Sequence, residues 1–312
     1  MKSCTAMAPC STANLGPGYD VFGLALDALD DTVKVTRLSS GVRRITIKTN
    51  DKAIPARPDS NSAGLVVKRM MCDFEIHDSL GIEIIKGIPA GYGIGSSAAT
   101  AAAAALAFNA LYGLKVPKNR LVQYAAEGEI ASAGVRHYDN VSASLLGGFV
   151  ISHISDNMPP QFTRLKPPQD LVLVVAVPLL EVPPKKTEEA RRVLPRHVPL
   201  KSIVRNISGA ATIVAGFALK NVETIASGID DVIIEPARKH LIPSYDDIKQ
   251  KAIFAGALAV TISGAGPSMI AFLKTSKNAK KVNAAMSQGF EAVGVKSRIL
   301  VCRPSRGACL VV

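Results

Sequence analysis

The chain has 312 residues, more than one small hydrophobic core requires, so its length predicts about two domains. Its 48% hydrophobic and 20% charged residues exclude disordered and fibrous proteins. The net charge is +12, but Lys and Arg are spread along the whole chain without an aromatic ladder, which favours a solvated basic surface and no nucleic-acid partner.

The first half of the chain predicts strands interleaved with helices. Apolar residues at helical spacing predict helices at Asn61–Asp73, Ser96–Leu111 and Asn119–Ser132. Alternating or continuous apolar runs predict strands at Thr32–Leu38, Arg44–Lys48, Ile82–Ile85 and Leu145–Ile154. The first two of these strands are separated by a turn at Ser39-Ser40-Gly41.

The second half follows a stretch rich in proline and polar residues, Asp156–Gln169, which we take as a domain boundary. The predicted domains are therefore residues 1–156 and 157–312. Helices are expected near 201–218, 221–227, 245–255 and 278–289, and strands at 171–177, 259–263, 269–273 and 296–302. Many strand pairs are close enough in sequence for antiparallel hairpins, which indicates an α+β fold rather than a doubly wound sheet.

A glycine-rich loop, residues 87–99, links a predicted strand to an alanine-rich helix. It reads Gly87-Ile88-Pro89-Ala90-Gly91-Tyr92-Gly93-Ile94-Gly95-Ser96-Ser97-Ala98-Ala99. Glycines allow the backbone to approach a ligand closely, and the first N–H groups of the following helix have no intrahelical acceptor. The loop therefore predicts a phosphate site at a helix N-terminus.

Two other kinds of phosphate-binding loop, and a turn that binds no ligand, are alternatives to this interpretation. A P-loop requires Gly-Lys-Ser/Thr, and no lysine lies in the loop. A dinucleotide fingerprint requires an acidic residue about 20 positions further on, where Lys115 and Lys118 make this chain basic. A plain capped turn is disfavoured by three alternating glycines followed by two serines.

Two further motifs accompany the loop, Asn14-Leu15-Gly16-Pro17-Gly18-Tyr19-Asp20 and Gly264-Ala265-Gly266-Pro267-Ser268. Together the three resemble the motifs of the GHMP kinase family in their order, spanning residues 8–272. The resemblance implies a two-domain α+β fold, with an N-terminal domain of the S5-domain-2-like type and a C-terminal ferredoxin-like α/β sandwich. It also implies transfer of the γ-phosphoryl group of ATP to a small-molecule hydroxyl, with Mg²⁺.

Within the family the chain resembles the homoserine kinases, which implies L-homoserine as substrate and threonine biosynthesis as the role. The resemblance rests on Ala8–Asp20, on His137–Val141 with the following glycine pair, and on the arginine segments Thr187–Arg191 and Glu235–Arg238. Small departures occur at Cys10, Ser11-Thr12, Ile94 and Ser142-Ala143. The alternatives are a mevalonate-, shikimate- or diphosphocytidyl-methylerythritol-type kinase of the same fold, or a nucleotide sensor without turnover.

Homoserine carries a carboxylate, an ammonium and a hydroxyl, and we expect six residues at these groups, Asn140 among them. A guanidinium fork suits a carboxylate, so Arg191 and Arg238 are the expected carboxylate ligands, although each could be a surface ion pair. Thr187 lies one helical turn before Arg191. Asn14 and Asp20 are expected at the ammonium and hydroxyl, or are simply turn residues.

Magnesium prefers hard oxygen ligands and usually retains waters, so one hydroxyl and one carboxylate are sufficient. The resemblance assigns these roles to Ser97 and Glu129. Glu127 competes with Glu129, and the two cannot share one helix face.

The resemblance places Asn140 where many family members have a catalytic aspartate. We expect Asn140 to hold the substrate hydroxyl in line, with Asp139 as a possible base or with no carboxylate base, because a loose transition state needs little deprotonation of the nucleophile. Asn61 and Lys86 are expected to border the adenine, and Gly264 to close over the phosphates. His137 is expected to form structural hydrogen bonds.

The remaining features favour the cytoplasm. The N-terminus lacks a signal peptide, no apolar run approaches the roughly 20 residues of a membrane span, and five cysteines without a CxxC pair give neither a disulfide framework nor a zinc site. We therefore expect no membrane partner. The resemblance implies a homodimer.

Overall fold

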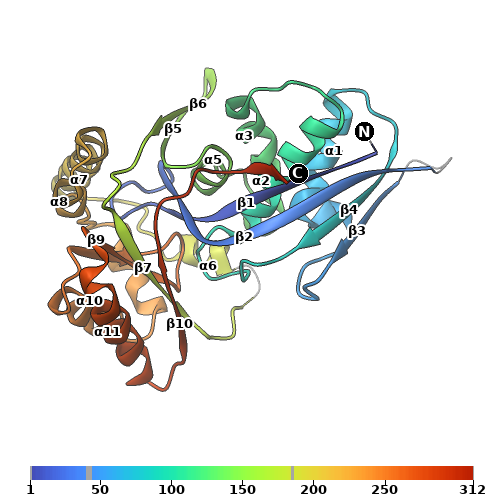
Figure 1. Ribbon diagram of the computed structural model, residues 1–312. Coiled ribbons are helices and arrows are strands. Elements are labelled where there is room, and N and C mark those ends of the chain that lie inside the picture. Colours follow the sequence, from blue (N-terminus) through green and yellow to red (C-terminus); the bar gives the residue numbers. More distant parts are fainter. Residues whose placement is uncertain (1, 40–43, 184–185, 312) are drawn as a thin grey trace.

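The computed structural model of the protein describes residues 2–39, 44–183 and 186–311. In this part of the chain the strands form two sheets, one of seven strands and one of four, with helices packed on both (Figure 1). The α+β fold class predicted from the sequence is confirmed.

The first sheet is built around two long strands. β1 (Ser3–Ala13) pairs antiparallel with β2 (Phe22–Leu38), which in turn pairs with β4 (Ser79–Ile85). β3 (Ile45–Thr49) pairs with β4 in parallel, so β2 and β3 are not neighbours in the sheet. Residues 40 and 41 of the predicted turn between them lie outside the described residues.

Five helices belong to the first sheet: α1 (Ser62–Asp73), α2 (Ser96–Leu111), α3 (Lys118–Glu127), α4 (Ile130–Ala133) and α5 (Asp139–Leu146). α2 is the central one, packed on β1 and β2 and flanked by α1, α3 and α5. Thirteen of its 16 residues are buried, most of them alanines. Because alanine side chains are small, neighbouring elements approach α2 closely and fix its N-terminus in place.

Two predicted elements of this half differ from the structure. The helix expected at 119–132 is interrupted at Gly128, where an added Cβ would lie 2.6 Å from the Ala101 Cβ. α3 ends at Glu127, and Glu129 is the N-cap residue of α4. The strand expected from Leu145 begins only at Phe149, because Leu145 still belongs to α5.

The segment 156–169, where a domain boundary was expected, contains a strand of the first sheet. β5 (Phe149–Ser155) pairs with β6 (Met158–Leu165), which adds this segment to the first sheet through the pairing of β5 with β2. The change from one sheet to the other falls between β6 and β7 (Val172–Pro178). At the other end of the chain, β11 (Cys309–Val311) returns to pair with β1.

The second sheet has the order β10-β7-β9-β8 and is antiparallel throughout. Its other strands are β8 (Ala259–Ile262), β9 (Met269–Leu273) and β10 (Ser297–Cys302). α10 (Tyr245–Phe254) and α11 (Ala279–Glu291) pack on it. Shorter elements are α6 (Lys186–Arg192), α8 (Val222–Ser227), α9 (Ile234–Arg238) and the 3₁₀ turns η1 (Pro58–Ser60), η2 (Lys239–Leu241) and η3 (Ser276–Asn278).

One helix qualifies the expectation that no segment could span a membrane. α7 (Leu200–Leu219) has 20 residues and a mean hydropathy of 1.4, enough by length and composition alone. It buries one face, including Ile213 and Phe217, against the protein and leaves Val204 and Ile207 exposed. A helix with one packed face is amphipathic, so its apolar residues serve at least partly in tertiary packing.

Candidate functional site

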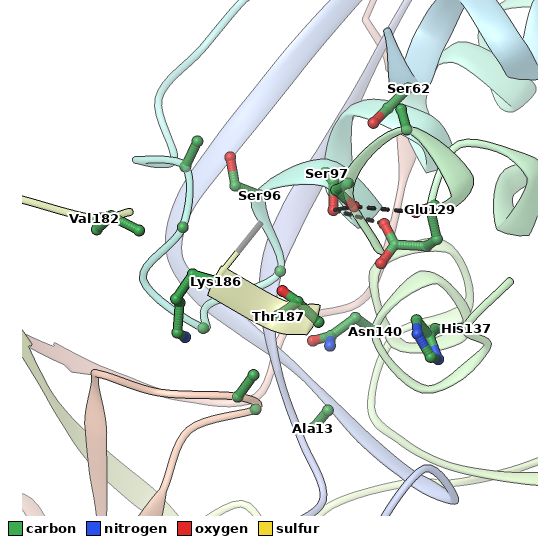
Figure 2. A pocket seen from close by; sticks show the side chains of 18 of the residues that line it. Ala13, Ser62, Ser96, Ser97, Glu129, His137, Asn140, Val182, Lys186 and Thr187 are labelled. Atoms are coloured by element: carbon green, nitrogen blue, oxygen red, sulfur yellow. Dashed lines mark hydrogen bonds between the residues drawn. The ribbon is translucent and has the colours of Figure 1, made fainter. Parts of the chain in front are cut away.

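A cavity of about 560 Å³ lies where the three sequence motifs meet. Its wall comes from the end of β1, the glycine-rich loop, α5, α6, α9 and the hairpin after β8 (Figure 2). This volume is in the range of pockets that hold small-molecule ligands. Residues distant in sequence, such as Ala13 and Thr187, face the same space.

The glycine-rich loop follows β4 and passes over the start of α2. Gly91, Gly93 and Gly95 have φ values of +88°, +73° and +69°, a conformation that residues with a Cβ rarely adopt. The Ser96 hydroxyl donates a 2.8 Å hydrogen bond to the Ile88 carbonyl and closes the loop. Since the loop lies at the N-terminus of α2, free N–H groups and the positive helix end are both available to an anion.

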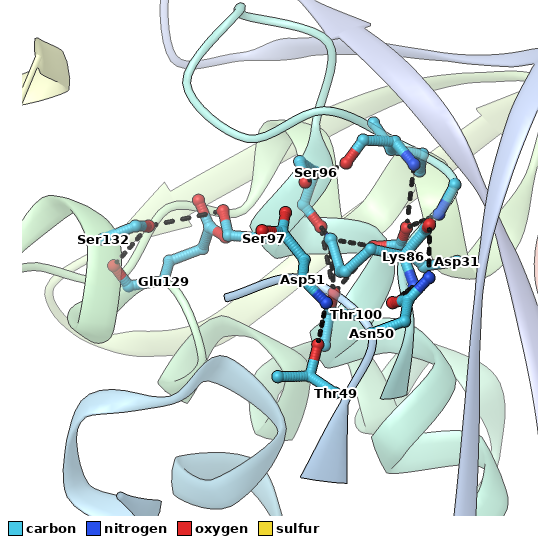
Figure 3. Close-up of polar contacts among 12 residues, drawn as sticks. Asp31, Thr49, Asn50, Asp51, Lys86, Ser96, Ser97, Thr100, Glu129 and Ser132 are labelled. Atoms are coloured by element: carbon cyan, nitrogen blue, oxygen red, sulfur yellow. Dashed lines mark hydrogen bonds and ion pairs between the residues drawn. The ribbon is translucent and has the colours of Figure 1, made fainter. Parts of the chain in front are cut away.

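A buried carboxylate anchors this loop to the first sheet (Figure 3). Asp31, on β2, accepts hydrogen bonds from the N–H groups of Gly87 and Ile88 at 3.0 and 3.1 Å. It also pairs with the Lys86 ammonium and accepts a 2.7 Å bond from the Thr100 hydroxyl on α2. The loop is therefore held at both of its ends before any ligand arrives.

The first and third motifs are joined directly to each other. The Asn14 Nδ2 donates to the Gly264 carbonyl at 2.8 Å, and the Asn14 Oδ1 accepts from the Asp20 N–H at 3.0 Å. The Ser263 hydroxyl donates to the carbonyl of Gly93 at 2.8 Å, which ties the hairpin to the glycine-rich loop. Asn14 thus lines the cavity while both of its amide atoms already bind protein.

A hydroxyl–carboxylate pair stands at the start of α2. The Ser97 Oγ donates a 2.6 Å hydrogen bond to the Glu129 Oε1, and both residues line the cavity (Figures 2 and 3). Burial raises the pKa of Glu129 to about 7, with the Ser97 hydrogen bond acting in the opposite direction. Glu127 points elsewhere and pairs with Arg136 at 2.8 Å. Of the two competing carboxylates, only Glu129 lies beside Ser97.

In the same cavity a cluster of ionic groups surrounds Arg191. Its Nη2 donates to both carboxylate oxygens of Asp20 at 2.8 Å and to the His137 Nδ1 at 3.0 Å. Because a guanidinium only donates, the His137 Nδ1 is an acceptor here. Burial and the charge of Arg191 lower the pKa of His137, which fits a neutral ring with a structural role.

Arg238 is almost completely buried at the end of α9. Its Nε donates to the Ala190 carbonyl at 2.9 Å, and its guanidinium lies 5.1 Å from the Tyr19 ring centroid. The guanidinium of Arg191 lies 5.5 Å from the same ring. Both guanidinium groups therefore lie near the same aromatic ring. Their like charges repel each other, and cation–π attraction to Tyr19 offsets part of this repulsion.

At the floor of the cavity the first turn of α5 presents Asp139 and Asn140. The Asn140 Oδ1 accepts a 2.9 Å hydrogen bond from the Ser11 hydroxyl on β1, and no bond from its Nδ2 is found within the described residues. The Asp139 carboxylate accepts from the Asn140 N–H at 2.7 Å. Burial, followed by the charge of Asp20, raises the pKa of Asp139 to about 7.

The structure brings together most of the residues singled out from the sequence, with two groups of exceptions. Asn61 and Lys86 reach the cavity wall, but Asn61 caps α1 through Gly64 and the Lys86 ammonium binds Asp31. Five loop residues do not line the cavity and can contribute only backbone groups: Pro89, Tyr92, Ile94, Ala98 and Ala99. Side chains of a tight loop alternate between the core and the cavity, a direction that sequence alone does not give.

Tyr19, Lys186 and Asp31 are among the residues of the site that were not predicted. Tyr19 belongs to the first motif and Lys186 directly precedes Thr187, so the positions of both residues in the sequence already indicated the site. Asp31 gave no signal, because an aspartate inside a strand is recognisable as an anchor only once β2 is placed beside the loop.

Comparison with known proteins gives consistent matches over the whole chain. Residues 61–148 match the family model described as GHMP kinases N terminal domain, and residues 213–292 match GHMP kinases C terminal. A homoserine kinase of Thermoplasma acidophilum is 37% identical over 97% of this chain and 95% of its own length. A homoserine kinase of Haloquadratum walsbyi is 38% identical over 98% of this chain and 99% of its own.

A solved structure agrees with the sequence relatives. The crystal structure of a homoserine kinase from Cytophaga hutchinsonii superimposes with a TM-score of 0.92 and 34% sequence identity, covering 100% of this chain and 98% of that one. The agreement extends over both sheets, so it concerns the arrangement of the whole chain as well as its motifs.

Proposed function

The chain belongs to the GHMP kinase family, and from this we propose that it is a homoserine kinase. It transfers the γ-phosphoryl group of ATP to the hydroxyl of L-homoserine, giving ADP and O-phospho-L-homoserine. Formation of this product is a step of threonine biosynthesis, which is the role expected from the sequence.

The observation that carries this proposal is the convergence of two kinds of anion site on one cavity. At one end the glycine-rich loop and the N-terminus of α2 offer backbone N–H groups suited to a polyphosphate. At the other end Arg191 and Arg238 stand together around Tyr19, and their guanidinium groups suit a carboxylate. Asp20 lies beside them as a partner for the ammonium group of an amino acid. Mevalonate also carries a carboxylate, but it has no ammonium group for Asp20, and shikimate likewise lacks one.

The residues at the start of α2 fit a magnesium ion. Ser97 and Glu129 supply hard oxygen atoms 2.6 Å apart, and Glu129 is a buried carboxylate with no cation paired to it in the described part of the chain. No cluster of three or more His, Cys, Asp or Glu in that part could hold a metal alone, as expected for an ion that keeps phosphate and water ligands. When bound, the ion would neutralise charge on the phosphates.

Transfer then depends mainly on positioning. Asn140 holds the substrate hydroxyl in line, with Ser11 fixing its Oδ1 and leaving the Nδ2 for the substrate oxygen. The hydroxyl oxygen forms a bond to the γ-phosphorus, and the bond from that phosphorus to the β–γ bridging oxygen breaks, its electron pair leaving with ADP. The hydroxyl proton is released late, to water, so no strong base is required.

Asp139 is the competing candidate for a base, since it lines the cavity and its pKa is raised to about 7. Under the proposed mechanism, Asp139→Asn leaves kcat within about tenfold of the original, because general base catalysis typically contributes 10²–10⁴-fold. A larger loss, together with disappearance of a pH-dependent limb, would identify Asp139 as the base.

A coupled assay with ATP and Mg²⁺ across L-homoserine, L-threonine, mevalonate, shikimate and galactose tests the function. We expect turnover with L-homoserine and little with the others. Nucleotide binding without turnover on any of them would indicate a sensor, and preferred turnover on mevalonate or shikimate would place the chain with another kinase of the family.

We further propose that the protein works in the cytoplasm as a homodimer, with α7 at the interface. Exposed apolar side chains recur along α7 every three or four residues, at Leu200, Val204, Ile207, Ala211, Ala215 and Leu219. A continuous apolar face of this length is suited to the same face of a second copy. Size-exclusion chromatography with light scattering should give a dimer that Ile207→Asp converts to a monomer. An unchanged dimer would exclude α7, and a monomeric parent protein that binds lipid vesicles would assign this face to a membrane surface.

A further inference from the structure

We propose that Lys186 is a further catalytic residue, whose ammonium group contacts the phosphoryl group in transfer and neutralises part of its charge. This inference rests on the proposed kinase function. It assigns to α6, in the second half of the chain, a cation that the glycine-rich loop itself lacks.

The first observation is an inventory of the cations that line the cavity. Lys86 is bound to Asp31, and it also donates to the Ser96 carbonyl and the Thr100 hydroxyl. Arg191 is bound to Asp20 and His137, and Arg238 donates to carbonyls of Ala190 and Gly264. For Lys186 no hydrogen bond or ion pair is found within residues 2–39, 44–183 and 186–311, although it lines the same cavity.

The second observation is the place of this side chain. Lys186 lies beside the glycine-rich loop and next to Thr187 on α6, and it lines the same cavity as Asn140 (Figure 2). The charge of Arg238, which is expected at the substrate carboxylate, also acts on Lys186, and both residues line the cavity. A lysine that lies beside the loop and feels the charge of Arg238 is suited to the region where the two substrates meet.

The electrostatic surroundings support a ligand-directed role. Burial, followed by the charge of Arg238 on α9, lowers the pKa of Lys186 to about 7, and Glu189 on α6 acts in the opposite direction. The other charged groups of the wall are Asp20, Lys86, Glu129, Asp139 and Arg191, with His137. A polyphosphate brings negative charge next to the amine and favours the ammonium form, so nucleotide binding should raise this pKa.

The chemical contribution follows from the charge changes in the reaction. As the bond from the γ-phosphorus to the bridging oxygen breaks, negative charge moves onto that oxygen and the equatorial oxygens, while the substrate oxygen forms the new bond. A fixed ammonium group beside these atoms stabilises them more in the transition state than in bound ATP. Lys186 donates hydrogen bonds and keeps its proton, so the proton released in the reaction is still that of the homoserine hydroxyl.

Steady-state kinetics of Lys186→Met, Lys186→Arg and a charge-matched control test the role. The control is Lys280→Met, which removes one exposed positive charge from α11. We expect Lys186→Met to lower kcat on the order of 10²-fold, the typical cost of losing one preorganised hydrogen-bond donor. Lys186→Arg keeps the positive charge, so it should retain part of the kcat. Lys280→Met should match the parent protein. An unchanged kcat in Lys186→Met, or an effect confined to the KM for homoserine, would overturn the proposal.

A binding measurement separates this inference from the function itself. Titration calorimetry of ATP at pH 8, in buffers of different ionisation enthalpy, should show uptake of nearly one proton by the parent protein, because an amine with a pKa of about 7 is mostly neutral there and becomes protonated in the complex. Lys186→Met and Lys186→Arg should lack this uptake. Equal proton uptake in all three proteins would refute the inference while leaving the kinase function intact, whereas failure of the parent protein to phosphorylate homoserine would refute the function.

Discussion

Replacing Gly93 by alanine tests whether the glycine-rich loop must press against the third motif. An added Cβ at this position would lie 2.3 Å from the Ser263 carbonyl oxygen and 2.6 Å from the Gly266 oxygen. Both are backbone atoms that cannot rotate away, so the loop or the hairpin must retreat by roughly 1 Å to reach an ordinary contact. A misplacement of about 1 Å in a catalytic site can cost on the order of 10²-fold in rate.

Gly294 provides a matched control for the backbone strain. Gly93 and Gly294 have nearly equal φ values of +73° and +74°, but a Cβ at Gly294 would meet nothing within 4 Å. Both alanine variants should lose about 1–2 kcal/mol of unfolding free energy from the left-handed conformation, measured by urea unfolding.

Only Gly93→Ala should lose further stability, and only it should lower kcat and raise the KM for ATP in the coupled assay. Equal stability losses with normal kinetics in Gly93→Ala would refute the close contact between loop and hairpin.

Three further changes test other parts of the site. Arg191→Ala and Arg238→Ala should each raise the KM for homoserine at least tenfold, because a charge-assisted bond is worth about 1.5–3 kcal/mol; a normal KM in both would remove them from the substrate site. Glu129→Ala should lower kcat and the affinity for Mg²⁺. Glu127→Ala loses only a bond to a surface arginine and should match the parent protein. A loss of kcat in Glu127→Ala and not in Glu129→Ala would assign the metal to Glu127. Burial raises the pKa of Asp139 from 3.8 to about 7, so the folded chain binds this proton more tightly than the unfolded chain and the contribution of Asp139 to stability falls as pH rises between these values. Asp139→Asn should remove that fall, so the unfolding free energies measured with urea at pH 5 and at pH 8 should differ less in this variant. An unchanged difference would contradict the burial of a titrating group.

Elements whose stability is local could be predicted from the sequence. α2 was predicted with its bounds, because alanines favour helix and a glycine–serine junction starts it. α1 was placed within one residue: the expected helix began at Asn61, which in the structure is the N-cap residue. Glu129 was preferred over Glu127 by resemblance, and the structure places it next to Ser97.

Features that depend on tertiary contacts could not be read in the same way. The pairing of β3 with β4 and of β6 with β5 joins segments through backbone hydrogen bonds that leave no mark on side-chain periodicity. The contact of Gly128 with Ala101 of α2 and the position of Lys186 on the cavity wall are likewise evident only in the folded chain. The glycine-rich loop was recognised at once, but Asp31, which anchors it, lies some 60 residues earlier and became evident only from the hydrogen bonds.

A crystal structure of the protein with a non-hydrolysable ATP analogue, Mg²⁺ and L-homoserine would test the central claim most directly. We predict the triphosphate on the N–H groups of Gly91–Ser97, the homoserine carboxylate on Arg191 and Arg238, and its hydroxyl facing the γ-phosphate beside Asn140. A triphosphate bound away from the glycine-rich loop, or homoserine bound away from both arginines, would contradict the proposed function.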